Sequence, residues 1–147
     1  VSGATLAAWE RDLRRPVGSQ PSSNGHDGEA PLRFETREIP PHWIDYNDHV
    51  TESRYLQLFG DATDALLRLV GVDASYLEGG SSYYTVESHL SHLRQLVAGD
   101  RVHVTTQLLG CDEKRLHLFH TLLRDGEDEP IATAEQMLVH VDAIADR

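Results

Sequence analysis

The chain has 147 residues, of which 39% are hydrophobic and 25% are charged, so its length and composition are those of one globular domain. It carries 13 Lys and Arg against 24 Asp and Glu, a formal net charge of −11. This balance argues against nonspecific binding to nucleic acid or to an anionic membrane, because neutralising phosphates requires a basic face. The single cysteine, Cys111, excludes an internal disulfide, disfavours a thiolate zinc site and agrees with a reducing, cytoplasmic location.

No apolar run approaches the roughly 18 residues of a membrane-spanning helix, and no secretory signal is visible at the N-terminus. Residues 1–15 predict a short amphipathic helix, either docked on this domain or left from an upstream domain. The first residue is Val rather than Met, which agrees with a piece of a longer chain. Residues 16–31 are rich in Pro, Gly and Ser and predict a flexible linker, so we expect the main domain over residues 32–147.

The first two elements of the main domain have clear patterns. Residues 32–39 alternate between two faces, which predicts a strand that ends at Pro40. Residues 51–71 carry apolar side chains at helical spacing over a wide arc, the strongest helical pattern in the chain. Thr51 is a suitable N-cap for this helix, and Gly71 is a suitable C-terminal stop.

After Gly79 the pattern changes to strand-like segments joined by short turns, at residues 82–96, 101–110, 115–124 and 131–142. Consecutive strands with such short turns must pair antiparallel. One apolar helix against one antiparallel sheet predicts an α+β domain. Because the helix is apolar over a wide arc, we expect the sheet to curve around it.

The segment from Trp43 to Thr51 concentrates polar chemistry. It places two Asp, one Asn and one His within five residues, directly before the predicted helix. Free N–H groups at a helix start can bind an oxyanion, and a carboxylate, an amide and an imidazole beside them could supply a base, a donor and a positioning group. The structural alternative is equally concrete, since turns and N-caps use the same residue types.

Other polar features favour structural roles. The histidines of each pair, 89 with 92 and 117 with 120, are three residues apart and point to opposite faces of a strand, so we expect no metal site. Tyr83 and Tyr84 fit ordinary strand packing or the wall of a pocket. The acidic run 125–129 is typical of a solvated turn.

The stretch Asp45 to Leu56 resembles the D-x-N-G-H-V-N-N-x-x-Y-L motif of hotdog-fold acyl-CoA thioesterases, the 4-hydroxybenzoyl-CoA thioesterase-like family. Residues 85–102 and 131–142 resemble strands and a turn of the same family, so the resemblance covers about residues 31–144. This sequence differs from the motif at two places that bear on substrate binding. Asp48 replaces a Gly of the motif, and Thr51 with Glu52 replaces Asn-Asn.

This resemblance implies a hotdog fold, in which a curved antiparallel sheet wraps a long central helix, and a dimer or dimer of dimers with active sites at the subunit interface. It implies no cofactor and no metal. Asp45 would be the general base or the nucleophile, Asn47 and His49 would orient it or contact the substrate, and backbone N–H groups near residues 50–54 would polarise the thioester carbonyl. The expected substrate-binding residues are Trp43, Tyr46, Val50, Thr51, Glu52, Tyr83, Tyr84 and Glu87.

The runs 49–55 and 59–64 resemble more narrowly the branch of this family that hydrolyses betainyl-CoA in carnitine catabolism and occurs fused behind a dehydrogenase. Betaine carries a trimethylammonium group, which aromatic rings bind by cation–π attraction. Candidate rings are Trp43, Tyr46, Tyr83 and Tyr84, and candidate contacts to CoA phosphates are Arg54, Arg94, Lys114 and Arg115. Two alternatives stay open: a noncatalytic module that binds acyl-CoA or a small cation, and a hydratase on the same fold.

Overall fold

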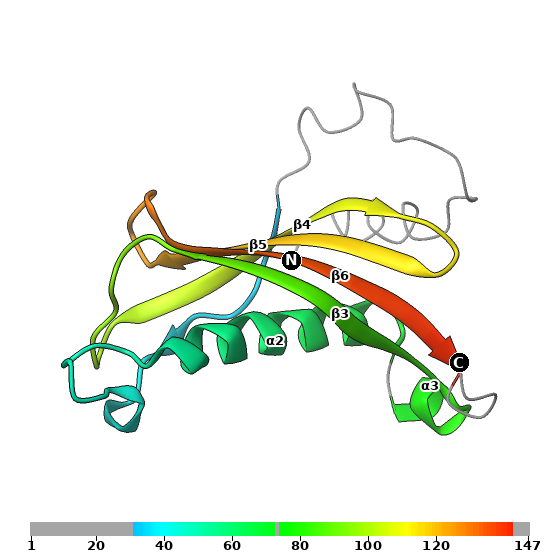
Figure 1. The fold of residues 1–147 in the computed structure, drawn as a ribbon, viewed down its shortest axis with the longest axis horizontal. Coiled ribbons are helices and arrows are strands. Elements are labelled where there is room, and N and C mark those ends of the chain that lie inside the picture. Colours follow the sequence, from blue (N-terminus) through cyan, green and yellow to red (C-terminus); the bar gives the residue numbers. More distant parts are fainter. Residues whose placement is uncertain (1–30, 73, 143–147) are drawn as a thin grey trace.

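A computed structural model describes residues 31–72 and 74–142 (Figure 1). The predicted helix 1–15 and the predicted linker, except for Pro31, lie outside the described residues. In the described part, helix α2 (Glu52–Leu69) lies along one face of a curved antiparallel sheet. The predicted α+β hotdog architecture is therefore confirmed.

The sheet has the strand order β1-β4-β5-β6-β3, with β2 also paired to β4. Each of its pairings is antiparallel, as the short turns predict. Its long strands are β3 (Ser81–His92), β4 (Arg101–Cys111), β5 (Arg115–Arg124) and β6 (Pro130–Asp142). The predicted bounds of β4, β5 and β6 agree with these to within one residue.

The predicted first strand is wrong as a single element. It forms two short pieces, β1 (Leu32–Arg33) and β2 (Arg37–Glu38), both against β4. Leu32 lies opposite Thr106 and Arg37 lies opposite Val102, so the N-terminal segment carries one residue more than β4 between these pairs. That extra residue interrupts the ladder, as a bulge does. A 3₁₀ helix, η1 (Pro41–Trp43), then leads into the polar loop.

The predicted strand 82–96 is too long at its C-terminal end, because β3 ends at His92. The N–H groups of Leu93 and Arg94 both donate to the carbonyl of Ile131, so the regular ladder stops there. Residues 93–96 leave the sheet and turn toward the start of α2, where the carbonyl of Leu96 accepts the N–H of Val50 at 2.9 Å. A short helix, α3 (Ala74–Glu78), precedes β3 and has no counterpart in the sequence prediction.

Helix α2 has the expected bounds to within two residues. Thr51 occupies the predicted N-cap position, although its side chain makes no capping hydrogen bond. At the other end Gly71 has a φ of +100°, the left-handed conformation that ends helices and that glycine adopts without strain. Tyr55, Leu58 and Phe59 face the sheet and are buried in the core.

Among residues 31–72 and 74–142, no helix is both long enough and apolar enough to cross a lipid bilayer.

Candidate active site

The polar loop before α2 is closed by its own backbone. Ile44 and Val50 form an antiparallel bridge, and the N–H of Asp45 donates to the carbonyl of His49 at 3.0 Å. The N–H of Asp48 donates to the carbonyl of Asp45 at 3.0 Å. These bonds fix the backbone of the loop at the start of the helix.

Asp45 is held in an Asx turn: its Oδ1 atom accepts the backbone N–H of Asn47 at 2.9 Å. The side chain is half-buried, and Oδ2 has no hydrogen-bond partner within the part of the chain that the structure describes. One oxygen of this carboxylate therefore sets its orientation, while the other is available to a water molecule or a substrate.

Asp48 has a φ of +61°, in the left-handed region. This geometry explains why the related motif has Gly at this position, since glycine enters the region without a steric penalty. Asp and Asn are the side-chain-bearing residues that tolerate it best. The departure from the motif at Asp48 therefore preserves the loop.

A cavity of about 830 Å³ lies in front of this loop. Six predicted site residues line it together: Asp45, Tyr46, Asn47, His49, Val50 and Glu52. Five further residues complete its wall, namely Tyr55 of α2 and His92, Leu93, Arg94 and Gln95 at and beyond the end of β3. Sequence reasoning named one of these five, Arg94, as a candidate contact to CoA phosphates, and it missed the other four. It extended the strand through residue 96 and so gave the segment after His92 no reason to approach the loop.

Tyr55 and His92 join the two sides of this wall. The rings of His92 and Tyr55 are nearly perpendicular, with centroids 5.0 Å apart. The hydroxyl of buried Tyr55 accepts the N–H of Leu96 at 3.2 Å, and burial raises the pKa of this hydroxyl. Tyr55 therefore stays neutral and anchors the segment after β3 against the helix.

Two predicted aromatic contacts differ in what they offer a ligand. Trp43 is buried, and two guanidinium groups already lie over its ring. The guanidinium carbon of Arg37 is 5.5 Å from the ring centroid, and that of Arg54 is 5.2 Å from it. Tyr46 is 93% exposed and lines the cavity. In one chain, Tyr46 is therefore the accessible predicted ring at this site.

Tyr83 and Tyr84 lie near the start of β3 and Glu87 lies at its middle, and none of the three lines this cavity. Tyr83 packs against His140 with ring centroids 5.2 Å apart, whereas Tyr84 and Glu87 are exposed. The cavity of one chain therefore does not bring these three predicted residues to the site.

The basic side chains predicted to contact CoA phosphates mostly bind neighbouring side chains instead. Arg94 pairs with Glu127 at 2.8 Å and with Glu129 at 3.3 Å. Of the other predicted phosphate contacts, Arg54 donates to Gln57 and Arg115 donates to Asp112. The carboxylates of the lining residues Asp45 and Glu52 have no ion-pair partner in the described residues, so the wall is net anionic.

The acidic run 125–129 is not simply solvated, which corrects the sequence interpretation. Asp125 binds Nδ1 of His103 at 2.6 Å and accepts the hydroxyl of Thr36 at 2.9 Å. The hydrogen bond from His103 is the main cause of a lowered pKa at Asp125. This turn therefore fastens the N-terminal segment to the sheet.

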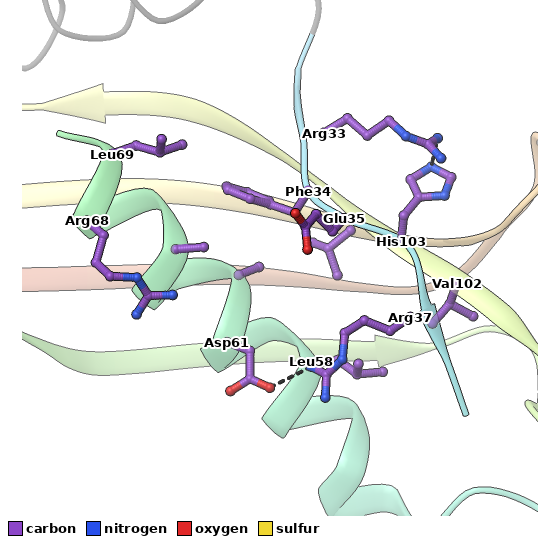
Figure 2. Close-up of a pocket in the computed structure, with 13 residues that line it drawn as sticks. Arg33, Phe34, Glu35, Arg37, Leu58, Asp61, Arg68, Leu69, Val102 and His103 are labelled. Atoms are coloured by element: carbon purple, nitrogen blue, oxygen red, sulfur yellow. Dashed lines mark hydrogen bonds and ion pairs between the residues drawn. The ribbon is translucent and has the colours of Figure 1, made fainter. Parts of the chain in front are cut away.

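A second cavity, of about 630 Å³, lies between α2 and the first two strands. Figure 2 shows the side chains that line it. This cavity contains none of the predicted site residues. Arg37 and Asp61 pair across its rim at 2.6 Å. Within residues 31–72 and 74–142, no group of three His, Cys, Asp or Glu side chains could hold a metal ion.

A helix held in a curved antiparallel sheet, with a carboxylate loop at the start of that helix, defines a hotdog-fold protein of the thioesterase class. Residues 39–146 match the Thioesterase-like superfamily, and the chain belongs to that family.

Curated relatives point the same way. The chain is 48% identical over 144 residues to the L-carnitine dehydrogenase/betainyl-CoA thioesterase of Rhizobium meliloti (strain 1021), a match that covers 98% of this chain and 29% of that protein. It is 46% identical over 109 residues to the betainyl-CoA thioesterase of Pseudomonas aeruginosa, covering 72% of this chain and 69% of that protein. The chain thus spans less than a third of the first relative's length.

Two solved structures share the fold. A putative thioesterase from Pseudomonas putida KT2440 is 42% identical, with a TM-score of 0.70 and coverage of 78% of this chain and 75% of that one. The hypothetical protein SAV2348 from Staphylococcus aureus, solved in complex with CoA, is 27% identical, with a TM-score of 0.74 and coverage of 80% and 75%.

Proposed function

We propose that this chain is an acyl-CoA thioesterase that hydrolyses betainyl-CoA to betaine and CoA. The observation that carries the proposal is the Asp45 carboxylate, which is oriented by one oxygen and open at the other, on the wall of a cavity at a helix start. The names of the curated relatives supply the substrate.

In this mechanism Asp45 takes a proton from a water molecule as the water oxygen attacks the thioester carbonyl. The backbone N–H groups of Glu52 and Ser53, in the first turn of α2, stabilise the oxyanion. The N–H groups of Val50, Thr51 and Arg54 do not take part, because they donate to the carbonyls of Leu96, Trp43 and Thr51. The C–S bond then breaks, and CoA leaves as a thiolate that takes up a proton from solvent. A second route has the Asp45 carboxylate attack the carbonyl itself, and water then hydrolyse the resulting anhydride.

The charge of the cavity supports a cationic acyl group. Asp45 and Glu52 contribute unpaired carboxylates to its wall, and Tyr46 offers an exposed ring. A quaternary ammonium gains from both, through Coulomb attraction and through the face of the ring. These features favour betainyl-CoA over a neutral acyl-CoA of the same shape.

We also propose a homodimer that pairs two copies of β3. This strand is 12 residues long and forms one edge of the sheet, with Tyr84 and Val86 more than half exposed. Long apolar edges invite pairing with another strand. Antiparallel pairing about a two-fold axis brings the start of one β3 to the end of the other, where His92 lines the cavity. The partner's Tyr83, Tyr84 and Glu87 would then approach the site.

The cytoplasmic location, and the fusion of this domain behind a dehydrogenase, stay predictions. The fusion is supported by the names of relatives of which this chain covers less than a third.

The test is release of free thiol from a panel of thioesters: betainyl-, acetyl-, medium-chain and aromatic acyl-CoA. The expected result is fast release from betainyl-CoA. Thiol release from the other thioesters but not from betainyl-CoA would support the thioesterase activity and contradict the proposed cationic substrate. CoA binding without thiol release would favour the binding module, and a hydrated acyl product would favour the hydratase.

Sedimentation equilibrium tests the dimer, and a monomer at micromolar concentration would contradict it.

A further inference from the structure

The turn between β5 and β6 reaches the wall of the candidate active site. Arg94 donates a hydrogen bond from Nη2 to Oε2 of Glu127 at 2.8 Å, and another from Nη1 to Oε2 of Glu129 at 3.3 Å. Arg94 lines the cavity, but neither glutamate does. The positive charge in this wall is therefore held by two carboxylates that lie outside the cavity.

A second layer of bonds fixes this arrangement. Arg124 donates to Glu127 at 3.1 Å, to the backbone carbonyl of Gln95 at 3.0 Å and to Asp100 at 3.2 Å. Hydrogen bonds from Arg94 first, and from Arg124 second, hold the pKa of Glu127 below its usual range. Glu127 therefore stays ionised at neutral pH and ties the segment after β3 to the β5–β6 turn.

We infer that Glu127 and Glu129 are positioning residues that set the substrate preference of the site through Arg94. They neutralise the guanidinium charge and hold this group at the β5–β6 turn. The electrostatic potential at a bound acyl group is then set mainly by the carboxylates of Asp45 and Glu52. This inference rests on the proposed function, because it explains how a cavity with an arginine in its wall accepts a trimethylammonium group.

The physical consequence of removing the two glutamates is specific. An unpaired Arg94 repels a cationic acyl group and competes for the carboxylates of Asp45 and Glu52. It has little effect on a neutral acyl group of the same shape. The preference for the cation should therefore fall at least about fivefold at low ionic strength, since an exposed charge within about 10 Å is only partly screened.

The experiment compares betainyl-CoA with 3,3-dimethylbutanoyl-CoA, in which carbon replaces the quaternary nitrogen and the shape is kept. The measured quantity is the ratio of kcat/KM for the two thioesters. We expect this ratio to fall at least about fivefold in the double variant Glu127→Gln/Glu129→Gln, and to recover when Arg94→Gln is added. The control is Asp128→Asn, which removes one negative charge from the same turn, where the double variant removes two, at an exposed residue with no ion pair to Arg94.

An unchanged ratio in the folded double variant, an equal fall in Asp128→Asn, or no recovery with Arg94→Gln would overturn the inference. If the double variant does not fold, the single variant Glu129→Gln tests the same ratio at a side chain that is 83% exposed. The expected fall is then smaller but still larger than in Asp128→Asn, because Glu127 keeps its ion pair with Arg94. Failure of the wild type to release thiol from either thioester would instead overturn the proposed function, so the two failures are distinguishable.

Discussion

The Asp45 carboxylate is fixed by the backbone N–H of Asn47, two residues further along the chain, at 2.9 Å. An asparagine at position 45 keeps an oxygen that can accept this bond, but it cannot act as a base. We therefore expect Asp45→Asn to keep the fold and to lower kcat by at least about a hundredfold, the usual scale for losing a general base. Thiol release from betainyl-CoA measures this effect, with circular dichroism as the check on folding.

The matched control for this variant is Asp48→Asn in the same loop. It removes the same charge, and Asn tolerates the left-handed backbone at this position as well as Asp does. We expect its kcat to stay within about threefold of wild type. A comparable loss in both variants would mean that the loop acts through its net charge, and an Asp45→Asn enzyme within threefold of wild type would remove Asp45 from the mechanism.

The helix and the long strands could be predicted because their patterns are local. Helical spacing over residues 51–71 and strand segments with short turns require no knowledge of distant contacts. The break between β1 and β2 could not be predicted, since it depends on how this segment registers against β4. The end of β3 at His92 likewise depends on the shared acceptor at Ile131.

The same division applies to the site. The loop from Asp45 to His49 is contiguous, so its composition and the family motif revealed it. His92 and Arg94 reach the cavity only because residues 93–96 leave the sheet, and Arg94 is neutralised by a turn more than 30 residues away. The spacing of three correctly predicted that the two histidines of each pair lie on opposite faces of their strand. It did not predict which residues pack against each face.

His92 and His89 provide a prediction with a control on the same strand. His92 lies on the face of β3 that packs against α2, and it lines the cavity. His89 lies on the other face of β3, and its partner on the neighbouring strand β6 is Glu135. We expect His92→Ala to lower kcat/KM for betainyl-CoA by about tenfold, mainly through KM, because the variant opens the wall; about 1.4 kcal/mol of binding corresponds to this factor. His89→Ala should change kcat/KM less than about twofold. Equal effects would assign His92 to the stability of β3 rather than to the site.

Two glycines should respond to alanine in opposite directions. Gly60 lies inside α2 with open space where a Cβ would be, so Gly60→Ala should raise the free energy of unfolding by about 0.5–1 kcal/mol. Gly126 has a φ of +82°, so Gly126→Ala should lower it by about 1 kcal/mol despite the open space around it. Urea unfolding at a fixed protein concentration measures both. A loss of stability in Gly60→Ala would indicate that a second copy packs against this part of the helix.

His120 lies in the core at 0% exposure, in a polar network between the sheet and α2. Its Nδ1 atom bonds the hydroxyl of Thr106 at 2.7 Å, and its Nε2 atom bonds the hydroxyl of Thr63 at 2.8 Å. Burial lowers the pKa of this imidazole to about 4, with a hydrogen bond to Gln136 opposing the shift. The neutral ring satisfies every contact if Nδ1 accepts from Thr106 and Nε2–H donates to Thr63.

This shift predicts a loss of stability in mild acid. Above pH 6.5 the ring is neutral in both the folded and the unfolded chain, so it adds no pH dependence. Below pH 6.5 the unfolded chain binds a proton that the folded chain does not bind until about pH 4, so stability falls as the pH falls. Between pH 7 and pH 5 this group alone should cost about 2 kcal/mol. His120→Gln lacks the titration, so its free energy of unfolding should fall by about 2 kcal/mol less than that of wild type over this range. Parallel pH profiles for the two proteins would contradict the lowered pKa, because they would show that His120 binds its proton at the same pH in the folded and the unfolded chain.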